Sequence, residues 1–221
     1  MKQETASIVD RIERSGCTLC PDLVNARTKI VVSRGNPNAD VVIVGQNPGA
    51  KEDESGKPFS GPAGQLLDRI VADAGFSVNN DFWYTNVVMC HTLGNARPST
   101  EHINNCSRNF SQITASQKKI VAVGSAAVEG ILRSYGPEYI AKTSLSMSKL
   151  LTHGQPIRLS GNKWLFITYH PSYLLRNQAA NPAFPDYQTI LNELKAAKAW
   201  DKEFEVLAED TANMYNQTSF F

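Results

Sequence analysis

Several side chains that could bind a ligand or assist catalysis gather in one polar stretch of the sequence. Residues 41–44 are a short run of β-branched residues, which is typical of a strand buried on both faces. Directly after this run come amide, carboxylate, glycine and aromatic residues: Gly45, Gln46, Asn47, Gly49, Glu52 and Phe59. Open α/β sheets bind ligands in the loops that leave the carboxyl ends of their strands. A surface turn would not need this combination, so we predict an active-site loop.

His170 is a second candidate for chemistry. Of the four histidines, it alone leaves a predicted buried strand (165–169) and runs straight into a proline. Taken alone, a histidine at a strand end is more often structural. Placed beside the polar loop of the first strand, it is suited to stabilise developing negative charge.

The four cysteines form a third candidate site. Cys17 and Cys20 make a Cys-x-x-Cys pair, whereas fifteen residues separate Cys90 from Cys106. Four cysteines in an intracellular chain of this length are not readily a disulfide framework. Four thiolates suit either a structural zinc ion or an iron–sulfur cluster, and the spacing alone leaves both open. We expect a metal site that joins the N-terminal segment to the loop after the second buried strand.

The elements that must position these residues alternate along the chain. Buried strands are predicted at 41–44, 82–88, 118–124 and 163–169, and helices at 64–74, 100–115, 126–134 and 185–202. No regular element is predicted in the polar loop or in residues 171–176. The alternation implies a three-layer α/β/α fold with a mainly parallel central sheet of four to five strands.

Composition limits the remaining possibilities. With 221 residues and 42% hydrophobic content, the chain is expected to form one domain over residues 1–203, followed by a tail (204–221) that we cannot assign. A formal net charge of +1 shows no globally basic surface, so any nucleic-acid site must be a local patch. The sequence has no apolar run long enough to span a membrane and no secretory signal at its start. We therefore expect a cytoplasmic monomer.

At this point the motifs resemble a known family. The pattern Gly45-Gln-Asn-Pro-Gly49 with Glu52-Asp53, followed by residues 56–67, resembles motif one of the uracil-DNA glycosylase superfamily, in its iron–sulfur class called family 4. Residues 170–176 resemble the second motif of that family, and residues 85–90 resemble its central strand. The likeness runs from about residue 17 to about residue 194. All four cysteines fall where the family has the ligands of a [4Fe–4S] cluster, which is the cofactor the resemblance implies.

The resemblance implies a monofunctional DNA glycosylase. Such an enzyme flips a pyrimidine out of single- or double-stranded DNA and hydrolyses its N-glycosidic bond, which leaves an abasic site. Phe59 would stack on the extruded base, Asn86 would hydrogen-bond its edge and His170 would stabilise the anionic base as it leaves. Gln46, Asn47 and Glu52 would lie near the sugar and the base.

The resemblance also implies residues that hold the DNA. Leu174, Leu175 or Arg176 would wedge into the duplex from the minor groove. Ser172 and backbone amides of the glycine-rich segments, which include Gly45 and Gly49, would hold phosphates.

The sequence departs from the family at the second and third positions of motif one. Family 4 usually has Glu-Ala or Glu-Gly where this chain has Gln46-Asn47, so Asn47 is our candidate for orienting the attacking water. Gly49 stands where the best-known branch excludes the methyl group of thymine, which predicts a pocket floor open to substituents at C5.

These departures keep several functions open. Uracil repair is one interpretation, and excision of modified bases from phage DNA in antiviral defence is another. A non-catalytic DNA-binding relative is a third, although Phe59, Asn86 and His170 argue against it. A nucleotide-binding protein is disfavoured because Gly45 and Gly49 fit neither G-x-G-x-x-G nor a P-loop.

Overall fold

The computed structural model describes residues 2–140 and 146–201. Six strands form one sheet in the order β1-β3-β2-β4-β6-β5. Their bounds are β1 (Ser33–Gly35), β2 (Val41–Gly45), β3 (Phe82–Asn86), β4 (Lys119–Val123), β5 (Ile157–Leu159) and β6 (Lys163–Thr168). The four central strands are parallel, and β1 and β5 pair antiparallel at the two edges. The predicted fold class is confirmed, with one or two more strands than expected.

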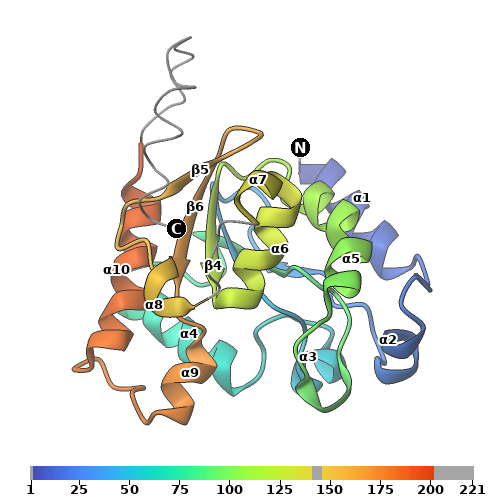
Figure 1. The fold of residues 1–221 in the computed structure, drawn as a ribbon, viewed down its shortest axis with the longest axis horizontal. Coiled ribbons are helices and arrows are strands. Elements are labelled where there is room, and N and C mark those ends of the chain that lie inside the picture. Colours follow the sequence, from blue (N-terminus) through green and yellow to red (C-terminus); the bar gives the residue numbers. More distant parts are fainter. Residues whose placement is uncertain (1, 141–145, 202–221) are drawn as a thin grey trace.

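Helices cover both faces of this sheet (Figure 1). One face carries α1 (Lys2–Glu13), α2 (Pro21–Ala26), α5 (Thr100–Ile113), α6 (Ser125–Tyr135), α7 (Pro137–Ile140) and α8 (Met147–Leu150). The other face carries α4 (Pro62–Asp73), α9 (Pro171–Arg176) and α10 (Pro185–Ala199). In β2, Val42 and Val44 pack into the first core, whereas Val41 and Ile43 pack into the second. Burial on both faces explains why this strand is apolar throughout.

Several short helices lie where the sequence predicted none, and two of them, α3 (Ala50–Ser55) and α9, carry residues of the candidate site. Helix α3 forms within the polar loop, and it ends at Gly56, whose φ of 76° is the left-handed conformation that glycine adopts readily. Helix α9 begins with a proline at its first position, and the His170 side chain accepts a hydrogen bond at its N-terminus. Six residues are too few to show helical periodicity, so pattern reading missed both.

The parallel strands bring their carboxyl ends to one edge of the sheet. The segments after β2, β3, β4 and β6 therefore meet there, and α3 and α9 lie at the same lower end of the molecule in Figure 1. A short 3-10 helix, η1 (Leu93–Asn95), interrupts the loop after β3. The predicted tail 204–221 lies outside the described residues. None of the helices in residues 2–140 and 146–201 has both the length and the apolar character to cross a bilayer.

Candidate active site

A cavity of about 760 Å³ opens at the carboxyl edge of the sheet. Ten of the twelve residues predicted to act in catalysis or substrate binding line it: Gln46, Asn47, Gly49, Glu52, Phe59, Asn86, His170, Ser172, Leu175 and Arg176. The remaining two, Gly45 and Leu174, lie behind its wall. Residues more than a hundred positions apart thus converge because the parallel strands end together.

Gly45 provides the space for two side chains at the end of β2. A Cβ at this position would lie 2.4 Å from Oδ1 of Asn86 and 2.7 Å from the ring of Phe59. Asn86 is only 4% exposed, and its amide has no hydrogen-bond partner among the described residues. The amide atoms are not among the fully buried polar atoms of the described residues that lack a partner, so they keep access to the cavity, where a ligand can complete their hydrogen bonds.

Phe59 is held in an unusual backbone conformation. Its φ is 56°, a region that non-glycine residues rarely adopt. Its ring packs edge-on against Tyr84, with 6.0 Å between the centroids. Gly64 allows this arrangement, since a Cβ there would lie 1.9 Å from the carbonyl oxygen of Phe59. Strained residues of this kind cluster at functional sites.

The amides of the Gln-Asn pair are linked to the loop after β3. Nε2 of Gln46 donates to Oδ1 of Asn47 over 2.8 Å, and Nδ2 of Asn47 donates to Oγ1 of Thr92 over 3.0 Å. The carbonyl oxygen of Asn47 keeps a second lone pair that can accept a hydrogen bond in the cavity.

Glu52 turns back over Gly49 from the first turn of α3. Its Oε1 accepts a hydrogen bond of 2.8 Å from the backbone N–H of Gly61, at the N-terminus of α4. A Cβ at Gly49 would lie 2.8 Å from its Oε2 and 3.5 Å from Oδ1 of Asn95. The space beside Gly49 is therefore filled by polar groups, and the open pocket floor that we predicted is not found at this position.

His170 is oriented by two residues of α9. Its Nδ1 accepts a hydrogen bond of 3.1 Å from the backbone N–H of Ser172 and lies 2.7 Å from the Ser172 hydroxyl. Arg176 in turn donates to that hydroxyl over 3.0 Å. Burial, with a smaller contribution from the Arg176 charge, lowers the pKa of His170 to about 4. The ring is therefore neutral at physiological pH, with Nδ1 as an acceptor and the proton on Nε2.

The two leucines of α9 differ in their environment. Leu174 is fully buried in the core beneath the helix, so the prediction that it reaches DNA is wrong. Leu175 is 38% exposed and lines the cavity beside Arg176. The reason is the helical geometry of α9, which turns successive side chains in different directions.

Sequence reasoning missed several residues of the cavity wall, namely Asn95, Arg97, Ser125, Met147, Tyr169 and Tyr173. A signal was present for Arg97 and Ser125, because each lies in a segment that follows a parallel strand, β3 or β4. The rule applied to the loop after β2 extends to these segments.

The four cysteines lie in one region beside the middle of α5, which carries Cys106. Cys20, Cys90 and Cys106 are buried in the same core, Cys17 is half-buried, and none of the four forms a disulfide. Burial, together with the neighbouring thiols, raises the pKa of Cys106 to about 12. Among the described residues, no three His, Cys, Asp or Glu side chains form a group that could hold a single metal ion.

Two side chains direct hydrogen bonds at the cysteine sulfurs. Nη1 of Arg27 donates to Sγ of Cys90 over 2.8 Å, and its Nη2 donates to the carbonyl of Cys17. Nδ2 of Asn105 donates to Sγ of Cys20 over 3.3 Å. These donors would stabilise thiolates, and the bond from Arg27 links the N-terminal segment to the loop after β3. That a metal site joins the two segments stays a prediction.

Asp53 connects this region to the cavity. The carboxylate, only 5% exposed, accepts hydrogen bonds from the backbone N–H groups of Thr28 and Lys29 and from the Thr28 hydroxyl. Burial opposes its ionisation, but these hydrogen bonds hold its pKa below the usual value. Helix α3, which carries Glu52, is thereby fixed to the chain that follows the Cys-x-x-Cys turn.

Comparison with known proteins identifies the class of this protein. Residues 32–195 match the family model of the uracil DNA glycosylase superfamily, and the chain belongs to that superfamily. The expected resemblance and the assignment as a DNA glycosylase, a hydrolase of N-glycosidic bonds, are thus confirmed.

Within the superfamily, the chain is similar to proteins named Type-4 uracil-DNA glycosylase. That of Thermotoga maritima is 33% identical over 205 residues, which cover 91% of this chain and 97% of the relative. That of Pyrobaculum aerophilum is 32% identical over 171 residues, with 76% and 84% covered. That of Archaeoglobus fulgidus is 30% identical over 183 residues, with 80% and 88% covered.

Proposed function

We propose that this protein removes uracil from DNA by hydrolysing the N-glycosidic bond of a flipped-out nucleotide. The observation that carries this proposal is the convergence of Phe59, Asn86 and His170 in one cavity. The names of the similar Type-4 proteins support uracil as the base. The protein acts as a monomer on single- or double-stranded DNA and leaves an abasic site.

Phe59 and Asn86 select the base. A flipped pyrimidine needs a face to stack on and a partner for its hydrogen-bonding edge. The Phe59 ring, fixed by Tyr84 and by its own backbone, supplies the face. The unpaired amide of Asn86 supplies a donor and an acceptor, which together match the adjacent carbonyl and N–H of uracil.

His170 stabilises the departing base. When the bond between the sugar C1′ and the base nitrogen breaks, the electron pair leaves with the base as an anion. The Nε2–H of the neutral ring donates a hydrogen bond to that charge, and the ring needs no proton from solution to do so. Ser172 and Arg176 hold the ring in this tautomer.

Asn47 orients the water that attacks C1′. Its carbonyl oxygen accepts one hydrogen from the water, while Gln46 and Thr92 fix the amide plane. An amide is a poor general base, so it acts by position, and the proton of the attacking water passes to solvent after the bond to C1′ has formed. Glu52, held at the N-terminus of α4, places negative charge near the positive charge that develops on the sugar.

Leu175 and Arg176 keep the base extruded from a duplex. Leu175 is the apolar side chain of α9 that is exposed at the cavity, which suits it to fill the gap left in the stack. Gly45 is buried behind the cavity wall, so the backbone amide at Gly49, with the Ser172 hydroxyl, holds phosphates of the same strand.

The four cysteines bind a [4Fe–4S] cluster in this proposal. The gathered thiols, their free state and the donors aimed at two of the sulfurs support the assignment. The cluster would join the N-terminal segment to the sheet.

A release assay on a panel of DNAs tests the function. The panel contains uracil in single- and double-stranded oligonucleotides, thymine mispaired with guanine, and phage DNA with modified pyrimidines, and abasic sites are scored by alkaline cleavage. We expect release of uracil from both strand contexts. Release from modified DNA alone would support the second candidate, excision of modified bases in antiviral defence, which the Gln46-Asn47 pair favours. Binding without any release would indicate a non-catalytic relative.

A further inference from the structure

Arg97 belongs to the loop after β3 and lines the cavity, and two residues of α6 bind its guanidinium group. Its Nη2 donates to Oε2 of Glu129 over 2.9 Å, and its Nη1 donates to the hydroxyl of Ser125 over 3.2 Å. The side chain is still 45% exposed. A guanidinium has five N–H donors, and three of those on Arg97 have no partner among the described residues.

Glu129 is a buried carboxylate that serves two arginines. Besides Arg97, it accepts hydrogen bonds from Nε and Nη2 of Arg133 and from the hydroxyl of Thr100. Burial opposes its ionisation, but the bonds from Arg97 and Arg133 hold its pKa below the usual value. One negative charge therefore faces two positive charges, and the group keeps a net charge of +1 at neutral pH.

Charge is scarce elsewhere around the cavity. Among the described residues that line it, Arg97 and Arg176 are the permanent cations and Glu52 is the one carboxylate. Arg97 follows β3 and Arg176 follows β6, and β2 and β4 lie between these two strands in the sheet. The Arg97 guanidinium, however, is hydrogen-bonded to Ser125 and Glu129 of α6, which follows β4, so it stands at the carboxyl end of β4, next to the strand that leads to Arg176.

We propose that Arg97, oriented by Glu129, binds a phosphate of the DNA strand beside the flipped nucleotide. This proposal rests on the proposed function, because it assumes that the cavity receives a nucleotide from DNA. An overall charge of +1 provides little general attraction to DNA, so a few fixed cations must supply the electrostatic part of binding. A guanidinium with free N–H groups in a fixed plane is suited to two oxygens of one phosphate.

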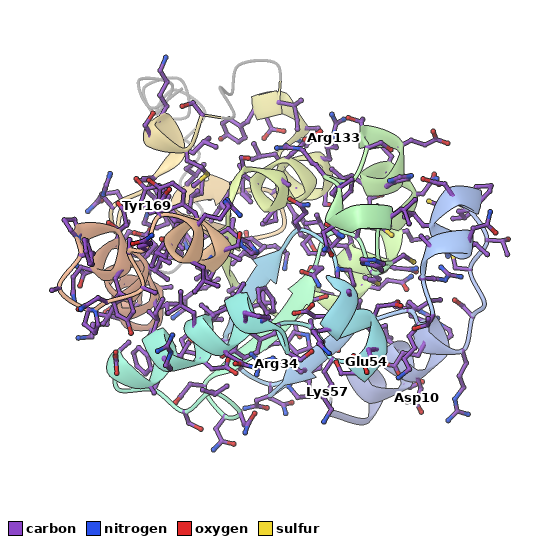
Figure 2. The ribbon with its side chains drawn as sticks, turned by 90° about the horizontal axis from the view of Figure 1, so that it is seen from below. Asp10, Arg34, Glu54, Lys57, Arg133 and Tyr169 are labelled. Carbon is purple, nitrogen blue, oxygen red and sulfur yellow. The ribbon has the colours of Figure 1, made fainter. Side chains whose placement is uncertain are left out.

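Arg133 offers a matched control. It contacts the same carboxylate as Arg97 but does not line the cavity. In Figure 2, Arg133 is labelled in the upper part of the view, whereas Tyr169, a residue of the cavity wall, is labelled at its left side. A purely structural role for the arginine–glutamate network predicts similar behaviour of R97Q and R133Q, whereas a phosphate contact affects R97Q alone.

The experiment measures binding of the full-length protein to a duplex that carries a tetrahydrofuran abasic-site analogue, which cannot react. We expect R97Q to raise Kd about tenfold near 0.1 M salt and to reduce the slope of log Kd against log salt by about 0.9. R133Q should leave both quantities unchanged. E129Q should raise Kd several-fold with an unchanged slope, because Arg97 keeps its charge but loses its orientation. Thermal unfolding checks that each variant is folded.

The outcomes separate this inference from the proposed function. If the wild type releases uracil while R97Q and R133Q have the same affinity and salt slope, the phosphate contact is refuted and the glycosylase activity stands. If the wild type releases no base but R97Q still loses affinity and slope, the DNA contact stands and the activity does not. Failure of the wild type to bind the duplex would overturn both.

Discussion

The cavity and the cysteine region are both assembled from distant parts of the chain, but they differ in whether their polar groups already have hydrogen-bond partners. In the cavity, the buried amide of Asn86 and most N–H groups of Arg97 have no partner among the described residues. In the cysteine region, Arg27 and Asn105 already donate to sulfur atoms. Because these groups face the cavity, a ligand can complete their hydrogen bonds. In the proposed function, the cysteine region would hold its cluster permanently.

Replacing His170 by alanine should have the largest effect on the cavity. Without the Nε2–H donor, the departing base loses its stabilisation, and we expect base release to slow by about 10²–10³-fold. The measurement is the single-turnover rate at saturating protein. The matched control is H153N, because His153 lies outside the cavity and its positive φ of 47° suits asparagine.

The pH dependence gives a second readout of the same residue. Since the pKa of His170 is lowered to about 4, its ring stays neutral from pH 8 to pH 5, and the wild-type rate should stay level as far as this group determines it. Stability should fall with His170 as pH drops from 6.5 toward 4, because the unfolded chain takes up the proton first. A loss of rate with a midpoint near pH 6.5 would refute the assignment.

Replacing Cys106 by serine tests the permanent character of the other region. We expect iron and acid-labile sulfide, about four of each per chain, to be lost from the purified protein. The midpoint of thermal unfolding should fall by about 6–12 °C, which corresponds to roughly 3 kcal/mol of stability linked to the cluster. The folded fraction should release base within about threefold of the wild-type rate, because none of the four cysteines lines the cavity. S107A, one residue along α5, keeps all four thiols and both donors to sulfur; it is the control and should retain its iron.

Two glycine substitutions sharpen the contrast between the cavity and the core. A Cβ at Gly45 would press on Asn86 and Phe59, whereas a Cβ at Gly136 would press on Tyr139 at 2.8 Å and on Leu159 at 3.0 Å. Overpacking of this kind costs about 1–3 kcal/mol. We expect G45A to slow base release at least tenfold with a modest loss of stability, and G136A to lower stability with the rate unchanged. Equal losses of rate in both variants would show that the cavity is not specially organised by Gly45.

Most of the sheet and of the cavity could be predicted because both leave patterns that can be recognised in the sequence before the fold is known. A strand buried on both faces leaves an apolar run, and the carboxyl ends of parallel strands must meet, so residues near 46, 86 and 170 could be placed together. Helices α3 and α9 were missed because six residues show no periodicity. The position of Glu52 over Gly49 depends on α3 and was therefore missed as well. The hydrogen-bond network of Glu129 could not be predicted either, since a single carboxylate within a helix gives no indication of its partners in the sequence.

Replacing Leu175 by alanine should have the smallest effect, and one restricted to duplex DNA. Its exposed side chain fills the gap left by the flipped base, so L175A should slow release from double-stranded DNA about three- to tenfold and leave release from single strands unchanged. The adjacent Leu174 is the control, because it is fully buried: L174A should lower the free energy of unfolding by about 2–5 kcal/mol without a strand preference. The ratio of the rates on the two substrates is the measurement, since it cancels losses common to both. If L175A slows both substrates equally, Leu175 belongs to the wall of the cavity and another part of the surface opens the duplex.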